Sequence, residues 1–171
     1  MKKPLFLILF LILIPVLNIY SQEINQSVAD EKAGREILCG VCDKKGLQTG
    51  EFKSYFKDYY SEYQPDSATM VNIRGNLDGI TITLVLGVWC SDSKEQVPRF
   101  YRLLDGVGFD ISNLRQVCVD SSKEACGVDI SDLNILKVPT FIFYKDGKEL
   151  GRIIETPVTS LEKDMLMIIS E

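Results

Sequence analysis

The chain has 171 residues, of which 46% are hydrophobic and 25% charged, a composition typical of a globular protein and not of a disordered one. Its net charge is −5 and no basic run follows the first three residues, which argues against a nucleic-acid partner because phosphate binding needs clustered lysine and arginine. Histidine is absent, which excludes Ser-His and Cys-His nucleophilic pairs and argues against a mixed-ligand zinc site. We therefore predict neither a metal nor a cofactor.

The first 21 residues resemble a secretory signal. Met1 and two lysines precede the apolar run PLFLILFLILIPVLNIY, which Pro15 interrupts and which is short for a membrane-spanning helix. Ser21 offers a small residue at a plausible cleavage point. We expect residues 1–21 to be a signal peptide and the protein to be exported, to the periplasm or outside the cell. The alternative is an uncleaved N-terminal anchor, through which alone the chain would meet a membrane.

Residues 22–78 are predicted to form a helical N-terminal extension that ends at a turn-like Asn-Leu-Asp-Gly cluster. Within it, 30–38 is a short helix candidate with Gly40 as its stop, and a helix capped by Asp66 or Ser67 is predicted to end at Arg74. Between these, aromatic residues recur at helical spacing: Phe52, Tyr55, Phe56, Tyr59, Tyr60 and Tyr63. Such a stripe could be a ligand platform, but packing against the main domain is the favoured interpretation, because aromatic faces carry much of a core's burial.

Before Gly79 the spacing of hydrophobic residues is mainly helical. After it, apolar β-branched runs typical of strands alternate with segments of helical spacing. The Asp146-Gly147 pair is a strong hairpin signal, and Thr159 with Glu162 forms a capping box for the last helix. In chain order we predict a buried strand over 80–89, a helix over 91–104, a strand over 115–119, a short helical or irregular piece over 133–137, strands over 140–144 and 149–154, and a final helix.

This β-α-β-(α)-β-β-α order resembles the thioredoxin family. The motifs that carry the resemblance are Trp89-Cys90 at a strand-helix junction, Pro98 within the first helix, Val138-Pro139-Thr140 before the third strand, and the hairpin sequence from Phe143 to Gly147. The resemblance covers about half the chain. It implies an α/β, thioredoxin-like three-layer fold over residues 79–171, with a central mixed sheet and the N-terminal helical extension before it. It also implies that Val138, Pro139 and Thr140 form a cis-proline, substrate-binding motif facing Cys90.

A cysteine in the first turn of a helix meets unpaired N–H groups and the positive end of the helix dipole, both of which favour the thiolate. Lys94 adds a positive charge nearby, whereas Asp92 opposes a second anion. The alternative is that Cys90 is a buried structural cysteine. Its place at the carboxyl end of a strand, where open α/β sheets present their sites, favours a working thiol.

Three positions depart from the family's pattern. Ser93 stands where the family has its second cysteine; a hydroxyl cannot attack a mixed disulfide, although it can donate a hydrogen bond to the thiolate. Leu84 stands where the family commonly buries an acid, and 155–157 replaces a glycine usually found near the substrate groove. We therefore predict a single-thiol site, with Cys90, Ser93 and Trp89 as its catalytic residues.

Four further cysteines remain. Cys39 and Cys42 form a C-x-x-C motif, for which a local disulfide is the favoured interpretation; inert thiols, or an accessory redox pair that resolves a Cys90 adduct, are the alternatives. A bridge between Cys118 and Cys126 is slightly favoured over two unrelated cysteines.

Our main hypothesis is that Cys90 carries out monothiol thiol-disulfide exchange, as an oxidoreductase or isomerase would. Its expected partners are disulfide- or thiol-bearing proteins or small thiols. One alternative is a redox-inactive thioredoxin-fold module for protein binding or assembly. Another places the activity in the N-terminal portion and treats the thioredoxin-like part as a scaffold. Peroxide reduction is disfavoured, because Asp92 and Ser93 do not supply the cation and donors that a peroxidatic thiolate needs. The client, the electron donor and the oligomeric state are not predicted.

Overall fold

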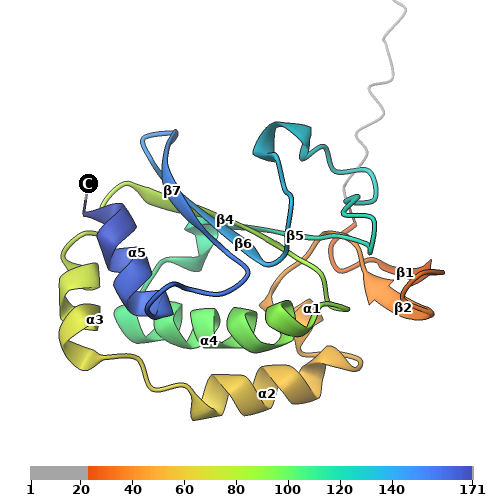
Figure 1. The fold of residues 1–171 in the computed structure, drawn as a ribbon, viewed down its shortest axis with the longest axis horizontal. Helices are drawn as coiled ribbons and strands as arrows, with labels where there is room; N and C mark the ends of the chain where they lie inside the picture. Colours follow the sequence, from red (N-terminus) through yellow and green to blue (C-terminus); the bar gives the residue numbers. More distant parts are fainter. Residues whose placement is uncertain (1–22, 171) are drawn as a thin grey trace, which may run out of the picture.

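A five-stranded mixed sheet forms the centre of the protein. The computed structural model describes residues 23–170, and Figure 1 shows the sheet with helices gathered along one side. Strand order is β3-β5-β4-β6-β7; β4 and β5 are parallel and the other pairs are antiparallel. The strands are β3 (Gly40–Val41), β4 (Ile80–Leu86), β5 (Leu114–Cys118), β6 (Thr140–Lys145) and β7 (Lys148–Ile154). The predicted α/β fold with a central mixed sheet is confirmed.

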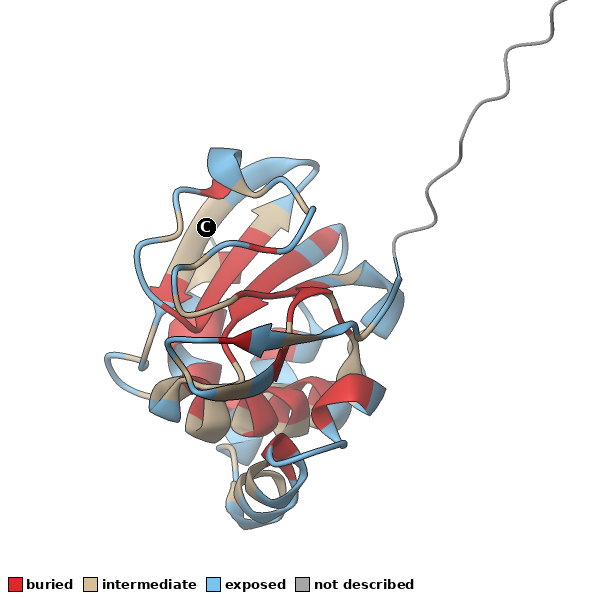
Figure 2. Ribbon diagram, turned by 90° about the vertical axis from the view of Figure 1, so that its right-hand side faces the viewer, coloured by how far each residue is buried: buried red, intermediate tan, exposed pale blue. Residues whose placement is uncertain are grey.

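Helices cover one face of this sheet. They are α1 (Lys44–Leu47), α2 (Phe52–Glu62), α3 (Ser67–Arg74), α4 (Ser91–Val107) and α5 (Leu161–Ile169). Leu84 of β4 and Phe141 of β6 are fully buried in the cluster that includes Phe100 of α4 and Met165 of α5. Figure 2 shows the buried residues concentrated in the central strands and in the helix beside them.

The opposite face of the sheet is covered by the segment between β5 and β6, which contains the short 3-10 helix η2 (Ser131–Leu133). Val85, Val117 and Ile142 point to this side and pack with Leu133 and Val138. Residues 84 and 85 are therefore buried on opposite faces, as alternation along a strand requires. Burial on both faces explains why β4 reads as a continuous apolar run.

The N-terminal part and the sheet share one hydrophobic core. Leu47, Phe52, Phe56 and Ile73 are at most 4% exposed and belong to the same cluster as Leu84. The predicted aromatic stripe does pack α2 against the main domain, and β3 joins the sheet edge through β5. The chain before residue 79 thus supplies a strand and several helices to a common core.

The predicted helix over 30–38 is wrong. This stretch forms the hairpin of β1 (Ser27–Asp30) and β2 (Arg35–Leu38), so the N-terminal part is not helical throughout. The reason lies in the turn: the carboxylate of Asp30 accepts the backbone N–H groups of Lys32 and Ala33, and Gly34 takes a left-handed φ of 67°. Asp30 also accepts hydrogen bonds from Ser121 after β5, a contact far away in the sequence.

Other boundaries follow the prediction with small shifts. The turn over Asp146 and Gly147 joins β6 and β7, and Asp66 caps α3 through the Thr69 N–H. The capping residue of α5 is Ser160 and not Thr159, with the Ser160 hydroxyl accepting from Lys163 N–H at 3.4 Å. Glu162 is buried and does not complete a capping box with Thr159. Its carboxylate accepts the hydroxyl of Tyr63 at 2.5 Å and the Asp66 N–H at 3.3 Å.

The predicted signal peptide, 1–21, lies outside the described residues. Within 23–170, the helices are too short or too polar to cross a membrane.

Candidate thiol site at the start of α4

Cys90 lies at the junction between β4 and α4. Strand β4 ends at Leu86, and a tight turn follows in which Cys90 N–H donates to the Gly87 carbonyl at 2.9 Å. Cys90 is the capping residue of α4, yet no side chain accepts the N–H groups of the helix's first turn. Its thiol is partly exposed and free. A thiolate here would meet both the unpaired N–H groups and the positive end of the helix dipole.

The residues predicted to bind substrate face this thiol. The Sγ of Cys90 lies 3.2 Å from the Val138 carbonyl oxygen, to which the thiol donates. The Val138-Pro139 peptide bond is cis, the form that the family resemblance implies, and Thr140 is buried beside it with its hydroxyl on the Lys137 carbonyl at 2.7 Å. The fold thus brings together two segments that lie 48 residues apart in the sequence.

Trp89 fixes the turn that carries Cys90. Its indole N–H donates to the Val119 carbonyl at 3.0 Å, and its ring folds back over Gly87. A Cβ at position 87 would lie 2.6 Å from ring atoms, a separation that real Cβ atoms do not show. Gly87 is therefore required for the indole to lie there, a role that the sequence analysis missed although the glycine stands two residues before the tryptophan.

Ser93 faces inward and not toward the thiol. It is fully buried, and its hydroxyl oxygen accepts the Gly87 N–H at 3.3 Å. Although this hydroxyl could have donated to the Cys90 sulfur, no hydrogen bond joins the two side chains. Ser93 sits in the first turn of α4 where the helix packs against the end of β4, so its oxygen pairs with the backbone of the turn. Its place in the site is to hold that turn.

The ammonium group of Lys94 interacts with residues of the N-terminal part of the chain. Its ammonium lies 3.8 Å from the Glu51 carboxylate and 4.4 Å from the centre of the Tyr55 ring, and its side chain is only 13% exposed. Lys94 therefore adds less positive field at the thiol than the sequence suggested. Glu51 was not among the predicted site residues, because nothing in its polar surroundings in the sequence distinguishes it.

A second charged group borders the site on the side of Val138. Lys137 pairs with Glu155 at 2.6 Å, and this hydrogen bond, together with the negative charge of Asp92, raises the pKa of Lys137 above its usual value. Glu155 takes a left-handed φ of 59° and donates its N–H to the Pro139 carbonyl at 2.7 Å. This is the stretch where the family usually has a glycine, and the backbone keeps a glycine-like conformation.

The predicted pairing of the other four cysteines is wrong. Disulfides join Cys39 to Cys126 and Cys42 to Cys118, with Cα atoms 5.6 and 6.1 Å apart. Strand β3 (Gly40–Val41) lies between Cys39 and Cys42, so the two cysteines flank a paired strand and do not close a local bridge. The antiparallel pairing of Gly40 with Cys118 instead brings Cys42 close to Cys118 at the end of β5, and Cys39 close to Cys126 in the segment that follows.

Neither Cys39 nor Cys42 has a free thiol in this structure, so neither can resolve a Cys90 adduct here. Cys42 and Cys118 are buried, and the Cys42 sulfur accepts a hydrogen bond from the Gln116 amide at 3.2 Å. Cys126 is the exposed member of the other bridge. The accessory redox role of Cys39 and Cys42 stays a prediction that this oxidised state does not support.

Comparison with known proteins agrees with the resemblance to thioredoxins. No family model matches the chain. Mitochondrial thioredoxin O of Oryza sativa subsp. japonica is 30% identical over 78 residues, which cover 46% of this chain and 42% of that protein. A thioredoxin of Aspergillus fumigatus is 28% identical over 74 residues, 43% of this chain and 64% of that protein. The chain therefore matches less than two thirds of either relative's length.

A solved structure supports the fold alone. A protein of unknown function from Pseudomonas aeruginosa aligns with a TM-score of 0.54 at 12% identity, covering 71% of this chain and 86% of the other. The chain is similar in sequence to thioredoxins, and its central mixed sheet agrees with the fold that the resemblance implies.

Proposed function

We propose that this thioredoxin-like chain is an exported thiol-disulfide exchange protein that works through Cys90 alone. The observation that carries the proposal is the position of Cys90. It has the free thiol of the chain, it opens α4, and its sulfur lies 3.2 Å from the Val138 carbonyl, whereas the other four cysteines are paired. A client polypeptide that reaches Val138 would thus meet the sulfur directly.

The chemical step is a thiol-disulfide exchange. Cys90 loses its proton to solvent, and the thiolate attacks one sulfur of a client disulfide. The client's S–S bond breaks, a new bond forms between Cys90 and that sulfur, and the other client sulfur leaves as a thiolate. No electrons are gained or lost overall in this step. The hydrogen bond from the thiol to Val138 exists only before the proton departs, so the Val138 carbonyl is then free to accept a client N–H.

Completion of the cycle requires a thiol from outside. Ser93 has no sulfur, and Cys39 and Cys42 are held in disulfides, so the Cys90 adduct persists until another thiolate attacks it. That thiolate could belong to the client itself, to a small thiol or to a reducing protein. Attack by a further cysteine thiolate of the client, other than the one that left, yields a rearranged client disulfide and releases Cys90 as a thiolate, which favours isomerisation or capture over net reduction.

Export is the part of the proposal that depends on the N-terminus. The predicted signal over 1–21 supports it, and two disulfides are what an oxidising compartment permits and a reducing cytosol does not.

The test is recovery of mixed disulfides from the compartment where the protein works. Cells are quenched with acid and alkylated, tagged protein is isolated without reductant, and attached proteins are identified after reduction. We expect partners released by reductant with wild-type protein and none with Cys90→Ala. Identical partner lists for the two proteins would contradict exchange and would instead favour the binding-module alternative.

A further inference from the structure

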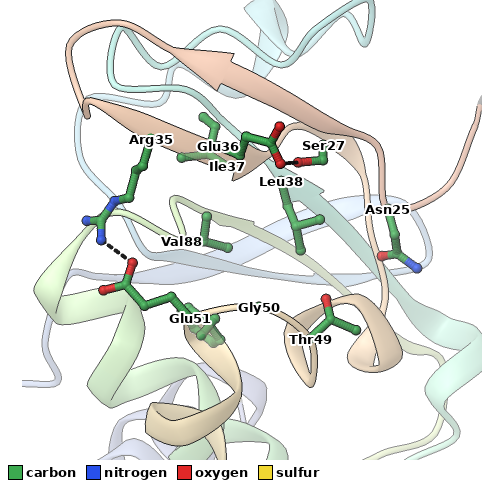
Figure 3. A pocket seen from close by; sticks show the side chains of 11 residues that line it. Asn25, Ser27, Arg35, Glu36, Ile37, Leu38, Thr49, Gly50, Glu51 and Val88 are labelled. Carbon is green, nitrogen blue, oxygen red and sulfur yellow. Dashed lines mark hydrogen bonds and ion pairs between the residues drawn. The ribbon is translucent and has the colours of Figure 1, made fainter.

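A cleft lies between the hairpin strand β2 and the loop that leads into α2, directly beside the turn that carries Cys90. It encloses about 230 Å³, and Val88 lines it from the turn. Figure 3 shows Leu38 and Val88 at the inner side of the cleft, with Arg35 and Glu51 meeting across its mouth. Pockets for drug-sized ligands and cofactors span roughly 300–1,000 Å³, so this cleft is small for such a molecule.

The β2 side of the cleft is the free edge of a strand. Four successive residues of β2, 35–38, line the cleft together with Asn25 and with Ser27 of β1. Because residues from both faces of β2 take part, the edge of the strand also borders the cleft. Among the described residues β2 pairs with β1 only. Its other edge is therefore open to a further strand.

Register identifies which backbone groups are free. Cys39 N–H donates to the Gln26 carbonyl, and hydrogen-bonded pairs alternate along an antiparallel ladder. Arg35 and Ile37 therefore direct their backbone groups to β1, whereas Glu36 and Leu38 direct theirs away from it. Within 23–170 the N–H and C=O groups of these two residues have no protein partner. An unpaired strand edge is a template for an added strand.

The cleft is coupled in space to the thiol. Val88 precedes Cys90 by two residues, so their Cα atoms are at most about 7 Å apart. On the other side, Glu51 pairs with Arg35 across the mouth and also lies 3.8 Å from Lys94, one helical turn beyond Cys90. Both signs of charge occur at the mouth, while Leu38, Val88 and Phe52 line the interior, which suits an apolar side chain on an otherwise neutral segment.

We propose that this cleft binds an extended segment of a client polypeptide, which adds as a strand to the free edge of β2 while a cysteine of the same segment reaches Cys90. The inference rests on the proposed exchange at Cys90 and names the form of its substrate. The client's backbone supplies N–H and C=O groups to Leu38 and Glu36, and an apolar client side chain lies over Val88. Specificity then comes from backbone extension more than from sequence.

The test uses the full chain and a short peptide of alternating valine and threonine. The peptide's single cysteine is activated as a mixed disulfide with thionitrobenzoate. When Cys90 attacks the peptide sulfur, the thionitrobenzoate thiolate leaves and its absorbance gives the rate. The symmetrical thionitrobenzoate disulfide, which has no backbone, reports the reactivity of the thiol itself.

Leu38→Pro removes the free N–H at the cleft without removing a bond to β1. Ala29→Pro is the matched control, because the same alternation directs its N–H to the far edge of the same hairpin. We expect Leu38→Pro to lower the rate of reaction with the peptide by about threefold to tenfold, which is the effect of losing one backbone hydrogen bond. Leu38→Pro should not change the rate of reaction with the symmetrical thionitrobenzoate disulfide, and Ala29→Pro should change neither rate. Equal rates for the two variants would overturn the inference.

Peptide variants give a second measurement on unmodified protein, in case Leu38→Pro fails to fold. N-methylation of every second peptide residue blocks only one edge of the peptide strand. Strand addition predicts that one of the two methylated sets slows the reaction and the other does not. Equal slowing by both sets, or by neither, would contradict strand addition.

Three other outcomes are decisive. If wild-type protein releases thionitrobenzoate from neither probe, exchange at Cys90 itself fails and this inference falls with it. If exchange proceeds but shows no dependence on methylation or on Leu38, only the cleft assignment is wrong. A dimer detected by sedimentation that Leu38→Pro dissociates would assign the edge to a second copy of the chain, and would also overturn the proposal.

Discussion

At the scale of single residues, Asp30 shows how one carboxylate decides a local structure. Its oxygens accept hydrogen bonds from the backbone of Ala33 and Lys32 and from the backbone and hydroxyl of Ser121. The hydrogen bonds from Ala33 and then Ser121 lower the pKa of Asp30 to about 2, from an ordinary value of 3.8. The ionised form therefore ties the hairpin to the segment after β5.

Asp30→Asn is predicted to destabilise the protein in a pH-dependent manner. Because the folded pKa of Asp30 lies below the unfolded one, its contribution is fully present above about pH 4 and is lost as pH falls toward 2. We expect the difference in unfolding free energy between wild type and variant, from urea titrations, to shrink over that window. Glu31→Gln, an exposed neighbour, is the control and should show no such trend. A difference that stays constant from pH 6 to pH 2 would contradict this account.

At the same scale, the site was predictable where chemistry depends on residue type and less so where it depends on orientation. Trp89, Cys90 and Val138 could be placed together because they lie in motifs that resemble those of the thioredoxin family, and that resemblance implies that the two motifs face each other. The inward direction of Ser93 and the pairing of Lys94 with Glu51 depend on how α4 packs on other elements, which no local pattern records.

At the scale of elements, the strongly periodic segments were predicted correctly and the weakly periodic one was not. The aromatic helix α2 and the apolar strand β4 bury wide, regular faces, and such faces are visible in sequence. The hairpin β1–β2 is short and charged, and its stretch DEKAGREIL contains several good helix formers. Contacts with Ser121 and the nearby disulfide, both distant in sequence, select the hairpin over a helix.

Ser160→Ala tests the start of α5. Because the Ser160 hydroxyl caps the helix through Lys163 N–H, its loss should cost about 1 kcal/mol of unfolding free energy. Thr159→Ala serves as the control and should change stability by less than about 0.5 kcal/mol, as substitutions away from such features do. Thermal and urea unfolding of both variants provide the measurement. A larger loss of unfolding free energy for Thr159→Ala than for Ser160→Ala would instead support the capping box predicted from the sequence.

At the scale of the whole molecule, two nested disulfides join the N-terminal part to the sheet. They span 76 and 87 residues, so with the inner bond in place the outer one closes only the 11 residues by which these separations differ. Sequence alone could not assign this pairing, because four cysteines allow three connectivities and the choice depends on where β3 joins the sheet.

Removal of the disulfides is predicted to be strongly non-additive. In the chain-entropy model, loss of either bond alone costs about 3 kcal/mol, because the remaining bond still closes a long loop, whereas loss of both costs about 7 kcal/mol. The variants are Cys39→Ala with Cys126→Ala, Cys42→Ala with Cys118→Ala, and all four together, compared by urea unfolding. A quadruple variant whose loss equals the sum of the two pairs would show that the bonds act independently.

The nested bridges also determine what a cut in the chain can release. Thr49 and Gly50 form an exposed loop between α1 and α2, downstream of both Cys39 and Cys42. A protease that hydrolyses the peptide bond there leaves the upstream fragment tethered through two sulfur links to the remainder. The nicked protein should migrate as one band without reductant and as two with it. Gel mobility after such a cut would therefore report the oxidation state of the bridges separately from that of Cys90.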